Sequence, residues 1–379
     1  MKQIFRKLHL WLSLPFGIVI TITCFTGALL VFEDEITAAC TSYMTKVSPE
    51  GAPLSVDEVV RRVESALPDD AQVTGVIIYP SPERAYKATL SKPQRASVYV
   101  NQYTGEVLGR YGRLPFFGTT FRLHRWLLDS NPGGGAIFWG KRIVGISTLS
   151  FVVILLTGLV IWWPRNRKML KNRLAVAVTK GKNRFWYDLH VAGGFYVMLV
   201  LLSLALTGLT WSFQWYRNGV NSIFAVDGQG NGGGKNVQQR GKAHCGKAEG
   251  AMTDLASARS TAPWQEAVDA VIAENPGYAQ LTVSKGSISV DNGSWGNMRA
   301  SDSYDFNPVT GEAGVVQRYG DMANRRSKLN GWIYTIHVGA WGGLFSKIVT
   351  FLAAILGATL PLTGYWLWIR RLYGKKKKA

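Results

Sequence analysis

Four long apolar stretches constrain what this chain can fold into more than any other feature of its sequence. Each is long enough to cross about 30 Å of hydrocarbon as a helix that rises about 1.5 Å per residue. A composition of 47% hydrophobic and 12% aromatic residues suits membrane spans joined to soluble parts. The sequence therefore predicts an integral membrane protein with an α-helical four-helix transmembrane bundle, whose apolar stretches cover residues 11–33, 143–163, 190–213 and 345–369.

Basic residues indicate how these spans are oriented. The formal net charge of +19 would otherwise suggest nucleic-acid binding, but most of the Lys and Arg residues flank the spans. By the positive-inside rule, both termini and the middle loop are cytoplasmic. The residues that carry this prediction are Lys2, Arg6, Lys7, Arg165, Arg167, Lys168, Lys171, Arg173, Lys180, Lys182, Arg184, Arg370, Arg371 and Lys375 to Lys378.

The predicted organisation alternates membrane segments with two large extracytoplasmic domains. The membrane segments are 1–33, 143–164, 190–213 and 345–369; the domains are 34–142 and 214–344; the cytoplasmic parts are the loop 165–189 and the tail 370–379. The second domain is longer because of a Gly-rich insertion at 227–262, which we expect to be a flexible loop or a partly ordered lid.

The chain also repeats itself, which predicts two related halves. One spacing joins two Leu-His pairs to two Thr-Gly pairs: Leu8-His9 to Thr26-Gly27, and Leu189-His190 to Thr207-Gly208. Thr-Gly-Glu occurs once in each extracytoplasmic domain, at 104–106 and 310–312, and we interpret it as the turn between the last two strands. Each domain begins with an amphipathic stretch, 55–66 or 263–273, followed by alternating strand-like runs. We therefore expect two small α+β modules in an internally duplicated protein.

Four of the five histidines lie at the ends of the predicted spans, and the fifth, His244, lies in the insertion. The topology places His9 and His190 at the cytoplasmic face and His124 and His337 at the opposite face. A histidine near a membrane helix is a candidate ligand for a metal or a haem. Zinc takes three or four protein ligands, so it would need nearby carboxylates such as Asp188, whereas a haem needs only two axial imidazoles. We therefore predict that these four histidines are the axial ligands of two b-type haems.

The Thr-Gly pairs support two sites at different depths. Seventeen residues of helix carry Gly27 and Gly208 about 25 Å from His9 and His190, to the level of the outer pair. Gly158 and Gly364 lie near the inner ends of their spans and reach the inner pair. We expect these glycines to let a macrocycle approach the backbone, although small residues also serve helix packing alone. Cations available for the propionates are Arg6, Lys7 and Arg184 inside, and Arg122, Arg125, Arg325 and Arg326 outside.

The three cysteines do not form a CxxC motif or a dense disulfide framework. Cys24 lies inside an apolar run, where it is expected to be a small buried residue. Cys40 and Cys245 both fall in predicted extracytoplasmic segments, so a disulfide between them is left open.

With its two Leu-His starts, repeated Thr-Gly-Glu, Trp-rich helix end at 157–163 and duplication, the chain resembles the PepSY-associated transmembrane-helix proteins along nearly its whole length. These are iron-regulated inner-membrane proteins of Gram-negative bacteria. The resemblance implies two bound haems and an oxidoreductase that reduces a ferric siderophore in the periplasm. The implied partners are a ferric siderophore, the lipid bilayer and a quinol or cytoplasmic electron donor, without nucleic acid.

Two other functions remain as alternatives. PepSY domains are associated with protease inhibition, so the modules could act as a membrane-anchored binding or sensor unit without redox activity. A transporter is disfavoured because the spans lack ionisable residues that would bind a coupling ion. Catalytic residues are not identified by the sequence; candidate substrate contacts are the aromatics near the outer face, Phe116, Phe117, Trp126, Trp139, Trp332, Tyr334 and Trp341.

Overall fold

A computed structural model describes most of the chain: residues 2–68, 71–92, 96–133, 136–224, 264–293, 296–307, 310–321 and 325–376. His244, Cys245 and the insertion 227–262 lie outside these residues, and so does the question of a Cys40–Cys245 disulfide.

Four helices in the described part of the chain are long and apolar enough to cross a membrane. They form a bundle in which the first helix, α1 (Lys2–Val31), packs against α6 (Trp139–Trp162) and α13 (Gly343–Lys376), while α6 also packs against α9 (Gly194–Ser212). The bundle core is apolar and includes Ile20, Phe151, Leu201 and Ala353. The protein is therefore a multi-pass membrane protein with a four-helix bundle.

The spans are longer than the apolar stretches alone indicate. The third span runs over Lys182–Ser212 as α8 (Lys182–Asp188), a π-helical turn η1 (Leu189–Gly193) and α9. The loop 165–189 also contains α7 (Arg167–Leu174), whose first turn is capped by the side chain of Asn166. The additional helical turns carry basic residues, whose long side chains can bring their charges to the water at the membrane surface.

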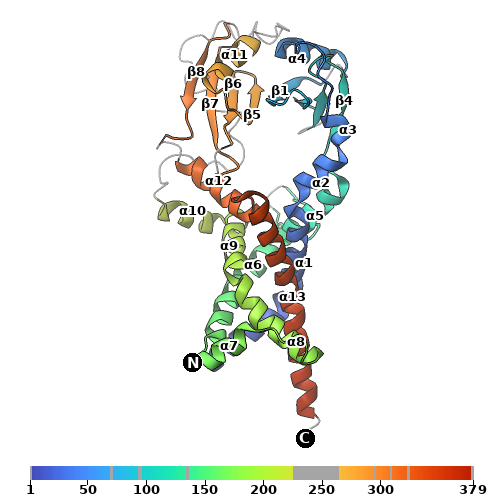
Figure 1. Ribbon diagram of the computed structural model, residues 1–379. Coiled ribbons are helices and arrows are strands. Elements are labelled where there is room, and N and C mark those ends of the chain that lie inside the picture. The colour runs from blue at the N-terminus through green and yellow to red at the C-terminus, as the bar shows by residue number, and fades with distance from the viewer. Residues whose placement is uncertain are drawn as a thin grey trace.

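One antiparallel sheet of eight strands lies beyond one end of the bundle (Figure 1). Its strand order is β4-β3-β2-β1-β5-β6-β7-β8. The strands are β1 (Val73–Ile78), β2 (Tyr86–Leu90), β3 (Ser97–Val100), β4 (Val107–Tyr111), β5 (Gln280–Ser284), β6 (Ser287–Asp291), β7 (Ser301–Phe306) and β8 (Ala313–Gln317).

The two predicted modules are joined edge to edge through β1 and β5, which pair antiparallel with Val76 opposite Val283. Each module contributes four strands and one helix, α4 (Val56–Ser65) or α11 (Trp264–Glu274). Side chains of both helices and of both groups of strands share one hydrophobic core. The sequence led us to expect two separate modules, whereas the structure unites them in one continuous sheet.

The Thr-Gly-Glu segments form matching turns between β3 and β4 and between β7 and β8, as predicted. Gly105 and Gly311 both have a φ of +74°, which favours glycine. In each turn, the amide of the glycine donates to the carbonyl of the asparagine four residues earlier, Asn101 or Asn307.

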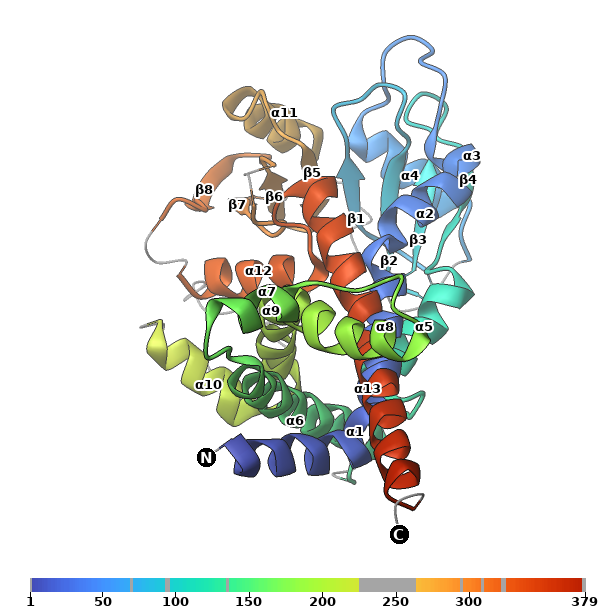
Figure 2. The ribbon, with the colours of Figure 1, turned by 60° about the horizontal axis from the view of Figure 1, so that its bottom comes forward.

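Short helices connect the sheet to the bundle. α2 (Glu33–Cys40) and α3 (Ser42–Thr45) follow α1, and α10 (Gln214–Ile223) follows α9. α5 (Pro115–Trp126) packs against α1, and α12 (Arg325–Val338) packs against α9. Both termini, α7 and α8 lie at the end of the bundle opposite the sheet (Figures 1 and 2).

Candidate functional site

The structure brings the four histidines together as two pairs, one near each end of the bundle. His9 on α1 faces His190 on η1 with ring centroids 6.5 Å apart and planes at 87°. His124 on α5 faces His337 on α12 with ring centroids 6.3 Å apart and planes at 56°. We call these the inner and outer pairs, as the sequence prediction did. Each pair combines one ring from each half of the chain.

All four imidazoles are held in the same way. The Nδ1 atom of each ring lies within hydrogen-bonding distance of a backbone carbonyl and a threonine hydroxyl on a neighbouring helix. The partners are Ile154 (3.0 Å) and Thr157 (3.1 Å) for His9, Leu360 (3.1 Å) and Thr363 (2.9 Å) for His190, Thr23 (2.9 Å) and Thr26 (3.2 Å) for His124, and Leu204 (3.0 Å) and Thr207 (3.1 Å) for His337.

These contacts fix the tautomer of each ring. A backbone carbonyl can only accept, so Nδ1 must carry the proton. The threonine hydroxyls donate to carbonyls of their own helices, as Thr157 does to Val153 and Ile154, and therefore also accept from the imidazole. In the neutral ring, Nε2 then keeps its lone pair, and it makes no hydrogen bond to any described residue. A histidine that donates Nδ1–H to a carbonyl and presents a free Nε2 is the arrangement of a metal ligand.

The predicted glycines also lie at the two pairs, but against the imidazoles. A Cβ atom on Gly27 would be 3.1 Å from Cε1 of His124, and one on Gly208 would be 3.1 Å from Cε1 of His337. The corresponding distances are 3.3 Å from Gly158 to His9 and 3.5 Å from Gly364 to His190. In the described structure, the missing side chain makes room for the edge of the imidazole ring, a reason for glycine that the sequence did not reveal.

The separation of the rings fits two imidazoles on opposite sides of one metal ion. An imidazole nitrogen binds a metal at about 2.0 Å and lies roughly 1.1 Å from its ring centroid, so two such rings have centroids about 6.2 Å apart. The observed separations are 6.5 and 6.3 Å. No group of three or more His, Cys, Asp or Glu side chains placed to hold a metal ion occurs among the described residues. Asp188, the carboxylate considered for zinc, accepts from Arg184 and from the amide of Ala177.

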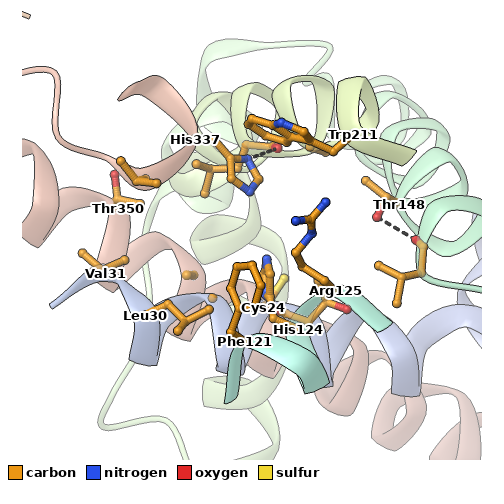
Figure 3. A pocket seen from close by; sticks show the side chains of 18 of the residues that line it. Cys24, Leu30, Val31, Phe121, His124, Arg125, Thr148, Trp211, His337 and Thr350 are labelled. Atoms are coloured by element: carbon orange, nitrogen blue, oxygen red, sulfur yellow. Dashed lines mark hydrogen bonds between the residues drawn. The ribbon is translucent and has the colours of Figure 1, made fainter. Parts of the chain in front are cut away.

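A cavity of 520 Å³ adjoins the outer pair (Figure 3). Pockets of about 300–1,000 Å³ hold ligands of cofactor size. Its walls are mainly apolar and come from α1, α5, α6, α9, α12 and α13, with Cys24, Phe121 and Trp211 among them. The hydroxyl of Ser147, which is 2% exposed and lines the cavity, has no hydrogen-bond partner among the described residues. A buried hydroxyl of this kind is satisfied when a water or a ligand atom lies beside it.

Charged side chains also line the outer cavity. Arg113 forms an ion pair with Glu33, and Lys347 pairs with Glu35 at 2.6 Å. Arg125 points into the cavity beside the two histidines (Figure 3). Of the other cations expected outside, Arg122 donates instead to the carbonyl of Leu128, and Arg325 and Arg326 begin α12. The histidines, the orphaned hydroxyl and the cavity together fit a haem with bis-imidazole ligation, with Arg125 placed for a propionate.

The inner pair has its own buried group without a partner. Trp162, 8% exposed, has an indole N–H with no acceptor among the described residues. Its ring stacks on Phe195 with centroids 3.7 Å apart. Trp162 follows Gly158, the glycine against His9, by one helical turn on the same face of α6. Of the cations expected here, Arg184 pairs with Asp188 at 2.7 Å.

Only some of the aromatic residues named as candidate substrate contacts line the outer cavity. Trp126 and Tyr334 line the outer cavity, but Phe116, Phe117, Trp139, Trp332 and Trp341 do not. Sequence reasoning missed Trp211, whose ring lies 5.0 Å from that of His337. The available signal was its position three residues after Gly208, on the helix face that meets His337.

The sequence matches the family model described as the PepSY-associated TM region over residues 6–371. The chain belongs to this family. Comparison with curated proteins gave no match. Membership in the PepSY-associated TM family establishes a membrane protein with a PepSY-associated region, in agreement with the bundle and the α+β sheet region described above.

Proposed function

We propose that this protein is a di-haem reductase of the bacterial inner membrane that moves electrons across the bilayer and reduces a ferric siderophore in the periplasm. The observation that carries the proposal is the repeated histidine arrangement. Four rings share one tautomer, two rings meet at each end of the bundle, and each separation suits a single six-coordinate metal. Histidines with only a structural role would have no reason to share the same tautomer, the same partners and the same separation.

A bound b-type haem would supply reversible one-electron exchange at each pair. The residues of the chain determine how that exchange is used. With an imidazole on each side, no coordination position remains for substrate, which suits electron transfer and disfavours oxygen chemistry. The carbonyl and threonine acceptors keep Nδ1 protonated and hold each ring in place, so that little reorganisation accompanies a change in charge.

The spacing of the pairs suits passage across a membrane. His9 and Thr23, the residue whose carbonyl holds His124, are fourteen residues apart on α1, or about 21 Å. The two pairs therefore lie within one bilayer thickness, near opposite ends of the same helix. We assign the inner pair to the cytoplasmic face because the segments beside it are rich in Lys and Arg.

The substrate is assigned as a ferric hydroxamate siderophore of the ferrioxamine type. In length and plan, the chain resembles ferrioxamine reductases of this family. Reduction of the chelate by one electron converts Fe(III) to Fe(II), a softer and less charged ion that hard hydroxamate oxygens hold more weakly. Iron is then released without destruction of the chelate. The electron donor is a quinol or a cytoplasmic carrier.

The decisive experiment is a reduced-minus-oxidised absorption spectrum of the purified protein, with the haem content per chain measured as the pyridine complex. We expect two b-type haems in the wild type, and loss or a high-spin spectrum of one haem in each of His9→Ala, His190→Ala, His124→Ala and His337→Ala. Oxidation of the reduced protein by ferrioxamine then tests the substrate. A colourless protein would refute the proposal and favour the alternative, a membrane-anchored PepSY binding or sensor module.

A further inference from the structure

The end of the bundle that carries the inner pair bears a strongly unbalanced charge. The segments at this end, 2–10, 163–189 and 370–376, contain one acidic residue, Asp188, which is 2% exposed and paired with Arg184. Exposed cations lie on α7, on α8 and on the segment between them: Arg167, Lys168, Lys171, Lys180 and Lys182. None of these five forms an ion pair with a described residue.

These cations are attached directly to the element that holds the inner ligand. α8 continues into η1, so Lys182 precedes His190 by only eight residues of helix, or about 12 Å. Both α7 and α8 pack against η1. A partner bound to this basic end would therefore lie close to the inner imidazoles.

The location favours a soluble partner over the lipid bilayer. Lipid headgroups surround the flanks of a membrane bundle, whereas soluble proteins approach its end. α7 and α8 lie at the end, together with both chain termini (Figures 1 and 2). Two exposed aromatic rings, Trp186 and Tyr187, accompany the cations on α8. Interfaces are enriched in aromatic residues that can bury apolar area within a charged rim.

Resting on the proposed electron-transfer function, we propose that this basic end is the docking surface for an acidic soluble electron-carrier protein, which donates to the inner pair. In each encounter the carrier would lose one electron, which a haem held by His9 and His190 would accept; no atom or proton would move. Opposite charges steer the two proteins together and raise the association rate, an effect that weakens as ionic strength rises. A quinol, which is uncharged and reaches the protein through the bilayer, has no such dependence.

The test compares two haem-loaded variants with an equal loss of charge. The first is Lys168→Gln/Lys171→Gln/Lys182→Gln, and the control is Lys46→Gln/Arg110→Gln/Lys285→Gln, whose exposed residues lie in the sheet region. The probe is reduced flavodoxin, an acidic carrier, mixed anaerobically with the oxidised protein in neutral detergent. We expect the rate constant of haem reduction to fall at least about tenfold in the first variant at low salt and to be unchanged in the control. Binding of oxidised flavodoxin to the immobilised protein should weaken in parallel.

Several outcomes would overturn the inference. These are equal rates in the two variants, a wild-type rate that does not depend on salt, or a first variant that loses affinity only for vesicles containing anionic lipid. Reduction by duroquinol must proceed equally in wild type and both variants, which shows that the inner site is intact. A protein without haem bands would refute the proposed function. If dithionite reduces the haem but the rate of reduction by flavodoxin does not depend on these lysines, only the docking surface is refuted.

Discussion

Adding one methyl group at each of the four glycines that face a histidine gives a graded test of the site. An alanine Cβ would lie 3.1 Å from the histidine Cε1 at Gly27 and Gly208, 3.3 Å at Gly158 and 3.5 Å at Gly364. Carbon atoms are in ordinary contact at about 3.5–4.0 Å, so the outer rings must move by about 0.4 Å, whereas the ring of His190 need not move. Alanine also favours a helix over glycine by about 1 kcal/mol, which opposes the clash equally at all four positions.

The expected result follows from how firmly the rings are held. Each outer histidine is fixed by two hydrogen bonds at Nδ1, so a shift of its ring either lengthens these bonds or tilts Nε2 away from the metal. Disturbing such supports typically weakens metal binding 10- to 100-fold, or by about 1.4–2.7 kcal/mol. We therefore expect Gly208→Ala and Gly27→Ala to lower the affinity for the outer haem by about tenfold or more. The affinity for the inner haem should fall less in Gly158→Ala and should match the wild type in Gly364→Ala.

The assay is the haem content per chain after dialysis against a haem-binding competitor such as apomyoglobin, with the thermal unfolding temperature measured in parallel. Gly364→Ala is the matched control, because it has the same chemistry at the position with the most space. Equal haem retention in Gly208→Ala and Gly364→Ala would refute the reasoning, because it would show that the outer rings are not confined by the glycines.

Three further predictions address other parts of the structure. Trp162→Phe keeps an aromatic ring on Phe195 but removes the indole N–H, so it should reduce the gain in unfolding temperature on haem binding. An unchanged gain would argue against a ligand atom at this indole. Gly75→Ala places a Cβ 2.5 Å from the carbonyl oxygen of Val283, so it should destabilise the pairing of β1 with β5 by about 1–3 kcal/mol in a thermal unfolding experiment. Gly112→Ala, with open space around it, is the control and should leave the unfolding temperature unchanged. Burial lowers the pKa of Lys87 to about 8, so above that pH the unfolded chain binds more protons than the folded one. The free energy of unfolding should therefore rise between pH 8 and 10. Lys87→Met should flatten this rise, and an equal rise in both proteins would contradict the prediction.

The sequence was sufficient to predict the features that depend on local pattern. Four apolar runs predicted the spans, and the Thr-Gly-Glu segments predicted turns that the structure contains. The partners of His9 and His124 followed from topology and from the repeat, because one histidine per span, with two on each face, leaves only one pairing within each face. Haem binding itself stays a prediction.

Features that depend on tertiary contact were not predictable. α5 and α12 were not predicted as separate helices, and their residues were assigned to the domains 34–142 and 214–344 without further detail. α12 mixes apolar, basic and aromatic residues without a strong helical period, so no local pattern marks it. The pairing of β1 with β5 depends on two edges meeting in space, which no local pattern encodes. The contact of each glycine with an imidazole likewise depends on how the helices pack, since the sequence shows only that the spacing from histidine to glycine recurs within the chain.

The mixed origin of the two histidine pairs has a consequence for assembly. His9 and His124 come from the first half of the chain, and His190 and His337 from the second, so neither half alone can complete a site at either end. A half on its own would also leave β1 or β5 as an open edge, able to pair with another copy. Two chains of one half could close that edge about a two-fold axis and complete both sites at once. Completion of each histidine pair thus requires the association of two halves, and the peptide link that joins them at 165–181 secures a pairing that separate subunits could also achieve.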